Sequence, residues 1–190
     1  ASAPVTRTIV VDNLPPVITV SAPAKTNFNP VTLRGTVDDS LTTVIVNGIT
    51  ASRSARAFTV SVPLTLGANT LSLVATSPNG YTTSRTYAVT LGTIPSIQAV
   101  QPAQASKVYT GTSLTIQVTA SDAEGDPIEY QVLIDNAPLG AWGNAATQPW
   151  TPGLGQLGLH TVTAAVRDAF GGDAAQQTRV YVVHQPVRSP

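Results

Sequence analysis

Short segments in which apolar and polar residues alternate run through the whole chain and constrain its fold more than any other feature. Alternation with a period of two places every second side chain on one face, which is the pattern of a half-buried β-strand. Thr and Val make up roughly a quarter of the residues, and both favour strands because they branch at Cβ. No segment shows the 3.6-residue period of a helix, so we expect an all-β protein.

The expected strands fall into two groups. The first group comprises residues 17–21, 31–37, 42–46, 57–64, 70–76 and 81–91. Within it, Asn47-Gly48 predicts a two-residue hairpin turn, because both residues tolerate positive φ. The second group comprises residues 113–120, 128–135, 160–168 and 178–183, whereas residues 136–159 are rich in Gly, Pro and Ala and place strands only weakly. Many short strands at close spacing predict two tandem antiparallel β-sandwiches, residues 14–92 and 97–184, followed by a tail at 185–190.

Residues 1–13 fit neither sandwich. The segment Thr6–Asn13 alternates like a strand, and Pro15-Pro16 separates it from the first sandwich. Two interpretations stay open. This leading strand, formed by Thr6, Thr8, Ile9, Val10 and Val11, either closes a preceding domain or is donated to the open sheet edge of a neighbouring copy, which would build a fibre.

The composition excludes several classes of protein. Lys plus Arg is 10 and Asp plus Glu is 10, so the chain lacks the surplus positive charge that a nucleic-acid binder needs. With no Cys and 2 His, little material exists for thiolate or acid–base chemistry, and we expect no catalytic residues and no enzyme. No apolar run approaches the roughly 18 residues of a membrane span. A low-charge, Thr-rich, Cys-free chain suits an extracellular or cell-surface location.

An acidic loop holds the candidate metal ligands. Asp122, Glu124 and Asp126 stand at alternate positions, and Asp168 follows a strand that should end on the same side of the sandwich. Calcium takes six to eight hard oxygen ligands, so these four carboxylates predict a calcium site, and we expect no other cofactor. In the alternative interpretation, Asp122 and Asp168 accept local turn bonds from backbone N–H groups. The spacing departs from that of a complete calcium loop.

Two Trp and two His complete the set of candidate side chains. Trp142, between Gly and Ala residues, is the better surface candidate and is predicted to contact a glycan, whereas Trp150 before a strand is predicted to be core. An aromatic content of 5% is low for a carbohydrate platform. His160 follows a Gly-rich turn, where we expect it to tether a structural corner, and His184 lies in the tail.

Several motifs carry a family resemblance. Residues 14–91 resemble a bacterial immunoglobulin-like repeat of surface proteins and glycoside hydrolase accessories through PPVITV, LRGTVDD, VIVNG, FTVSVPLTLGANTL and VATSPNGYTTS. Residues 97–183 resemble bacterial cadherin-like and PKD-like modules through VTASDAEGDPIEYQV, GLHTVT and AVRDAFGG. The resemblance implies immunoglobulin-like sandwiches that act as spacers, stalks or adhesive surfaces.

Together these observations predict a non-catalytic extracellular structural or adhesive segment, whose copies assemble end to end through the leading strand. The expected partners are copies of the chain itself, neighbouring immunoglobulin-like domains, or a surface glycan or protein. The alternative is a carbohydrate-binding accessory module of a secreted enzyme. Removal of residues 1–13 and the substitution Trp142→Ala would separate the two hypotheses.

Overall fold

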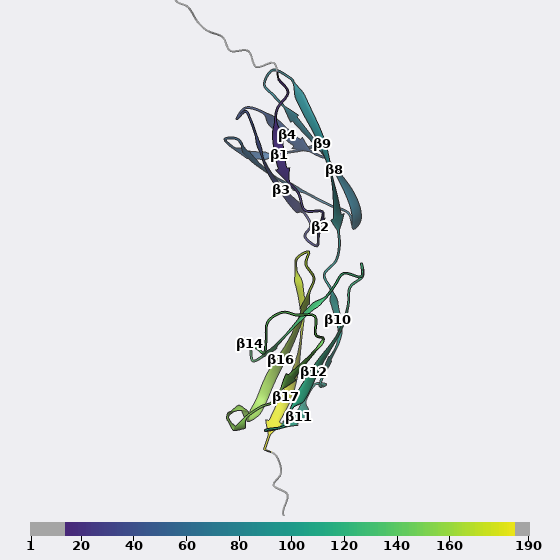
Figure 1. Cartoon of the computed structure of the whole chain (residues 1–190), viewed down its shortest axis with the longest axis vertical. Helices are drawn as coiled ribbons and strands as arrows, with labels where there is room; N and C mark the ends of the chain where they lie inside the picture. The colour runs from purple at the N-terminus through teal and green to yellow at the C-terminus, as the bar shows by residue number, and fades with distance from the viewer. Residues whose placement is uncertain (1–13, 185–190) are drawn as a thin grey trace, which may run out of the picture. The chain divides into compact units, whose positions relative to one another are not determined.

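The computed structural model describes residues 14–184, and the chain divides into two compact units after Leu91. Each unit is a β-sandwich of two sheets (Figure 1), called here the first domain and the second domain. Among the described residues the single helical element is one 3-10 turn, η1, at Leu154–Gln156. The predicted all-β class and the two sandwiches are confirmed.

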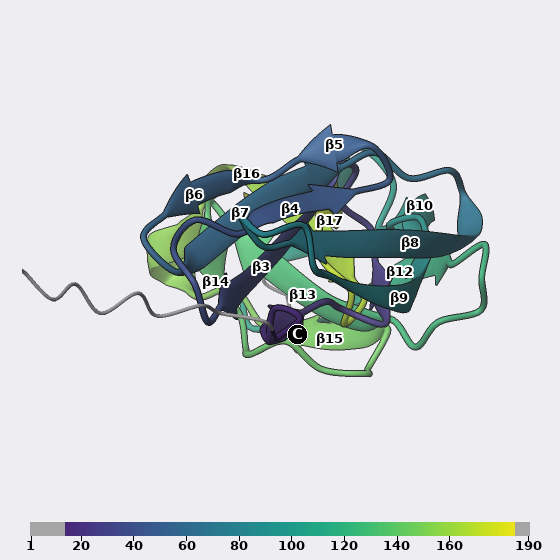
Figure 2. The same ribbon diagram turned by 90° about the horizontal axis from the view of Figure 1, so that it is seen from above.

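Nine strands form the first domain: β1 (Ile18–Ser21), β2 (Lys25–Thr26), β3 (Val31–Val37), β4 (Thr43–Val46), β5 (Ile49–Thr50), β6 (Ser52–Ser54), β7 (Ala57–Val62), β8 (Gly67–Thr76) and β9 (Thr82–Leu91). One sheet has the order β1-β3-β7-β6, and the other has the order β2-β9-β8-β4-β5. The pairs are antiparallel except that β2 runs parallel to β9. The long β8 and β9 run side by side over their whole length (Figures 1 and 2).

Alternate residues of these strands fill the first core. Along β8, Leu71, Leu73 and Ala75 are buried while the residues between them face outward or are half-buried. The expected hairpin at Asn47-Gly48 joins β4 to β5, with positive φ at both residues. Gly35 of β3 allows close packing, because a Cβ there would overlap the Thr19 carbonyl oxygen and the Phe58 ring.

Eight strands form the second domain: β10 (Ser96–Gln101), β11 (Ser106–Tyr109), β12 (Leu114–Ser121), β13 (Glu129–Ile134), β14 (Ala137–Pro138), β15 (Thr147–Trp150), β16 (Gly158–Arg167) and β17 (Asp173–Val183). The sheets have the orders β10-β12-β15 and β11-β17-β16-β13-β14. Again one pair is parallel, β11 with β17. The core contains Ile116, Val132, Val162 and Val166, and Trp150 belongs to it as expected.

The ten strand segments expected from the sequence are present, and further strands were missed. Four of the missed strands, β10, β11, β14 and β15, lie in the second domain. Each of them is an edge strand, paired on one side only among residues 14–184. β11, β14 and β15 have four residues or fewer, too few to show a clear period. β15 even contains Pro149, which an edge strand tolerates.

Candidate functional site

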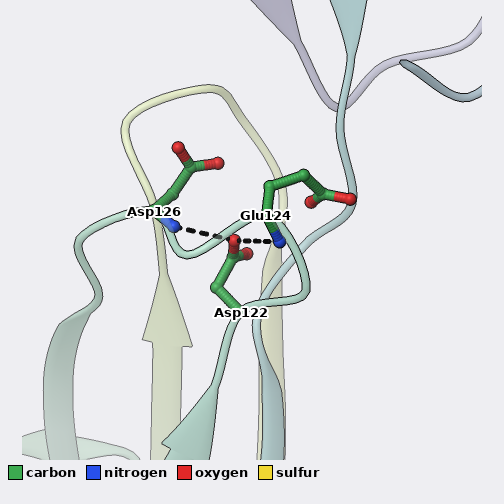
Figure 3. A group of neighbouring side chains, drawn as sticks. All are labelled: Asp122, Glu124 and Asp126. Carbon is green, nitrogen blue, oxygen red and sulfur yellow. Dashed lines mark hydrogen bonds between the residues drawn. The ribbon is translucent and has the colours of Figure 1, made fainter.

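The acidic loop joins β12 to β13 and is closed by its own hydrogen bonds. The Asp122 carboxylate oxygen Oδ1 accepts hydrogen bonds from the backbone N–H groups of Glu124 at 3.0 Å and Asp126 at 2.9 Å (Figure 3). Gly125 completes the turn with φ of +76°. This is the local turn that the alternative interpretation of Asp122 predicted.

Three of the four expected calcium ligands lie together. One carboxylate oxygen from each of Asp122, Glu124 and Asp126 falls within 4.8 Å of the others, and Figure 3 shows Glu124 and Asp126 on either side of Asp122. Glu124 Oε2, however, already accepts hydrogen bonds from the N–H and the hydroxyl of Thr93, both at 2.9 Å. The ligand atoms are hard oxygens of the kind calcium prefers, but three carboxylates supply fewer than six of them unless all three bind through both oxygens.

Asp168 is not in this group of three. It lies in the turn between β16 and β17, is 5% exposed, and accepts a hydrogen bond from the Phe170 N–H at 2.7 Å. The first domain has a matching feature, because the buried Ser77 hydroxyl accepts a hydrogen bond from the Tyr81 N–H in the β8–β9 turn. A buried polar cap in both hairpin turns points to a structural use of Asp168. Calcium binding by the acidic loop stays a prediction.

An open pocket of about 700 Å³ lies beside the β16–β17 turn of the second domain. Its polar and aromatic lining consists of Glu129, Trp142, Asn144, Arg167, Asp168 and Asp173. Trp142, the expected glycan contact, is therefore at a concave surface and is half-buried. The volume of the pocket lies in the range of small-ligand sites, but its lining is more polar than theirs usually is.

Arg167 organises one wall of the pocket. Its guanidinium carbon lies 4.3 Å from the centre of the Trp142 ring, which is cation–π geometry. The same guanidinium donates to Glu129 Oε2 from Nε at 2.9 Å and approaches it through Nη2 at 2.8 Å. Glu129 and Arg167 face each other directly across the β13–β16 pair. Neither residue was singled out from the sequence, because no local pattern shows which strands pair and in which register.

His160 tethers a corner, as expected. Nδ1 lies 2.6 Å from the Asp135 carboxylate, Nε2 lies 2.8 Å from the Gln156 carbonyl oxygen, and the ring meets Trp150 edge to face at 5.7 Å. The backbone N–H of Thr161 donates to the other Asp135 oxygen at 2.9 Å. The hydrogen bond from Thr161 and, with a smaller effect, the one from His160 hold the pKa of Asp135 below its ordinary value of 3.8. Both nitrogens of the imidazole therefore take part in structural hydrogen bonds.

The predicted assembly strand, Thr6 to Val11, lies outside the described residues. What the structure does describe is the sheet edges that such a strand could join. Within residues 14–184, β1 and β10 each end a sheet with one flank unpaired. β10 carries an irregularity between Ile97 and Ala99, a device that commonly discourages edge pairing.

Comparison with known protein families agrees with the fold of two successive β-sandwiches. Residues 8–93 match a family of cadherin-like β-sandwich domains, and residues 95–164 match a family of bacterial Ig domains. The chain has the fold of two tandem immunoglobulin-like domains. The resemblance expected from the sequence is confirmed, with the cadherin-like match in the first domain and the bacterial Ig match in the second, the reverse of the expected order.

One solved structure shows the same fold, and others are similar to a lesser degree. The fibronectin(III)-like modules of CbhA from Clostridium thermocellum match with a TM-score of 0.58 and 18% identity, covering 92% of this chain and 98% of that one. Extracellular domains 3–5 of Drosophila OTK match at 0.47 and 11%, covering 84% and 58%. The titin I-band fragment I67–I69 matches at 0.43 and 14%, covering 89% and 66%. No curated protein sequence matches. Among the described residues no helix is long and apolar enough to cross a membrane.

Proposed function

We propose that this tandem is a non-catalytic structural or adhesive segment of an extracellular protein. Each domain closes its own core: one cluster is built only from residues of the first domain and the other only from residues of the second. These separate cores are the observation that carries the proposal. Two domains that each fold around their own core can join other parts of a longer protein and present surface to protein partners without further ligands.

The use of polar side chains supports this function. In enzymes, buried titratable groups usually converge on a cleft with perturbed pKa values. Here the buried Ser77 and Asp168 cap hairpin turns, Asp168 beside the pocket of the second domain, and His160 is held by Asp135 and the Gln156 backbone. Asn29 is used in the same way, since its side chain bonds both backbone groups of Leu64. These side chains maintain loops and corners.

The finer proposal concerns assembly. The leading strand, Thr6 to Val11, pairs with an unpaired sheet edge of a neighbouring copy and joins copies end to end. The edges at β1 and β10 are the candidate acceptors, and β1 is the better one because it lacks the irregularity of β10. Backbone hydrogen bonds along an added strand would supply affinity, and alternate side chains would supply register.

Sedimentation velocity and negative-stain electron microscopy at neutral pH test the assembly. The whole chain is compared with a variant lacking residues 1–13 and with the substitution Val10→Lys, which puts a charge on the strand. A variant lacking residues 185–190 is the matched control. We expect oligomers and filaments for the whole chain and the control, and monomers for the other two. A whole chain that sediments as a monomer at high concentration contradicts the assembly proposal.

A second candidate function is carbohydrate binding through Trp142, as an accessory segment of a secreted enzyme. It is favoured by one observation, the placement of Trp142 in the pocket of the second domain. Aromatic rings bind the apolar faces of sugar rings, and the surrounding polar side chains supply partners for hydroxyl groups.

A further inference from the structure

Contacts within the second domain fix Trp142 at the pocket without any ligand. Gly143, the residue after Trp142, forms a two-way backbone bridge with Tyr130, with N···O distances of 2.7 and 3.2 Å. The stacked Arg167 guanidinium fixes the ring itself, and the ion pair with Glu129 fixes the guanidinium. A site whose side chains are already in place spends less free energy on ordering when a ligand binds.

The polar groups around Trp142 suit hydroxyl groups. Asn144 offers an amide that both donates and accepts, and Asp173 offers an exposed carboxylate at the start of β17. Arg167 and Glu129 add a planar guanidinium–carboxylate pair. Neighbouring hydroxyl groups on a sugar ring can bridge such planar pairs, while the C–H face of the ring meets the aromatic side chain.

The charge of the lining narrows the class of sugar. Three carboxylates, on Glu129, Asp168 and Asp173, line the pocket against one guanidinium, on Arg167. The guanidinium is already paired with Glu129. An acidic sugar would therefore bring its negative charge close to like charges without an unpaired cation to meet it, and like charges at close range repel.

We infer that this pocket binds an uncharged sugar residue of a glycan and rejects uronic acids. The inference rests on the second candidate function and adds to it the substrate class and the residues that select it. The face of the Trp142 ring that Arg167 does not cover supplies the stacking surface, Arg167 and Glu129 hold the ring in place, and Asn144 and Asp173 bond the hydroxyl groups.

Titration of the whole chain by tryptophan fluorescence tests the inference. The chain has two Trp, and because Trp150 is 5% exposed in the core, Trp142 is the one that a ligand in the pocket can reach. The probes are uncharged tetrasaccharides of glucose, mannose, galactose and N-acetylglucosamine, together with tetragalacturonate as the acidic probe. We expect a saturable change with at least one uncharged probe below about 10 mM and none with tetragalacturonate.

Variants locate the binding. Trp142→Ala should weaken binding of the uncharged probe by about tenfold or more, measured by NMR chemical-shift titration because the fluorophore is lost. Tyr109→Ala is the matched control, since it removes an exposed aromatic of the same domain outside the pocket lining. Circular dichroism confirms that each variant folds.

The results distinguish failure of the charge selection from failure of carbohydrate binding itself. No response to any of the five probes overturns carbohydrate binding altogether. Tetragalacturonate binding as tightly as the uncharged probes overturns the charge selection and leaves carbohydrate binding standing. Binding that survives in folded Trp142→Ala, or is lost equally in Tyr109→Ala, overturns the assignment to this pocket.

Discussion

At the scale of single residues, the corner around Asp135 shows how one side chain serves several parts of the fold. Asp135 and Asn136 have φ of +49° and +69°, and they form the tight turn between β13 and β14. Asp and Asn tolerate this left-handed conformation better than most residues. From the turn, the Asp135 carboxylate accepts from both the Thr161 N–H and His160, which links the turn to β16.

This corner gives the second domain a dependence on acid pH. The Thr161 N–H and then His160 stabilise the Asp135 carboxylate and lower its pKa below 3.8 in the folded state. A carboxyl with a depressed folded pKa contributes stability above its unfolded pKa and loses that contribution as the pH falls through the folded value. We therefore expect Asp135→Asn to unfold more easily than the native chain at neutral pH, with the difference shrinking below about pH 3.8.

Urea unfolding followed by tryptophan fluorescence at a series of pH values between about 2 and 7 measures this difference. Asp173→Asn is the matched control, because Asp173 is an exposed carboxylate of the same domain. A stability difference between Asp135→Asn and the native chain that is constant across this range would show that the carboxylate charge is not the source.

The sequence located the candidate residues unevenly. The alternate spacing of Asp122, Glu124 and Asp126 was enough to bring them together, because one short loop carries all three. Asp168 depended on the relation between two loops, and it caps its own turn instead of joining the group. Trp142 was recognised by its Gly-rich surroundings, but its stacking on Arg167 depends on a strand pairing that no local pattern reveals.

At the scale of elements, the central strands were predictable, whereas β1 was the one edge strand within residues 14–184 that the sequence revealed. The alternation in β3 and β8 is strong, because each is paired on both sides and buries every second residue of much of its length. β2 and β5 have two residues each, too few to show a period. The parallel pairings of β2 with β9 and of β11 with β17 were also missed. No local sequence pattern shows that a short edge strand pairs with the last strand of its domain.

These parallel pairs predict the mechanical strength of each domain. In each pair, a strand near the start of the domain lies parallel to the last strand, so pulling on the chain ends draws the two strands in opposite directions and loads all their hydrogen bonds together. β11 pairs with β17 over four residues, and β2 pairs with β9 over two. The longer pair should raise the barrier to forced unfolding, and the unfolding force depends on the rate of crossing that barrier. We therefore expect the second domain to unfold at the higher force.

Single-molecule force spectroscopy of the whole chain measures the two events. Lys107→Pro, at an exposed position of β11, should lower the force of the stronger event and leave the weaker one unchanged, since Pro disrupts strand pairing. Lys107→Ala is the control and should change neither. If Lys107→Pro alters only the weaker event, the assignment of strength to the β11–β17 pair is wrong.

At the scale of the whole molecule, two hydrophobic cores account for stability without cross-links. The chain has no Cys, so no disulfide contributes, and each core is closed by strands of its own domain. The sequence predicted this organisation, because the two groups of strands are separated by a Pro-containing break near residue 95. The division of the chain after Leu91 lies beside that break. We therefore expect each domain to keep its fold independently of the other.

The independence of the two cores is the central claim, and Leu73→Ala tests it most directly. Leu73 is fully buried in the first core, and truncating such a Leu costs about 2–5 kcal/mol. Both Trp residues lie in the second domain, so tryptophan fluorescence follows that domain alone, while far-UV circular dichroism follows both. In urea, we expect the variant to lose part of its circular dichroism at lower denaturant, with an unchanged fluorescence midpoint. A fluorescence midpoint that falls together with the circular dichroism would contradict the account.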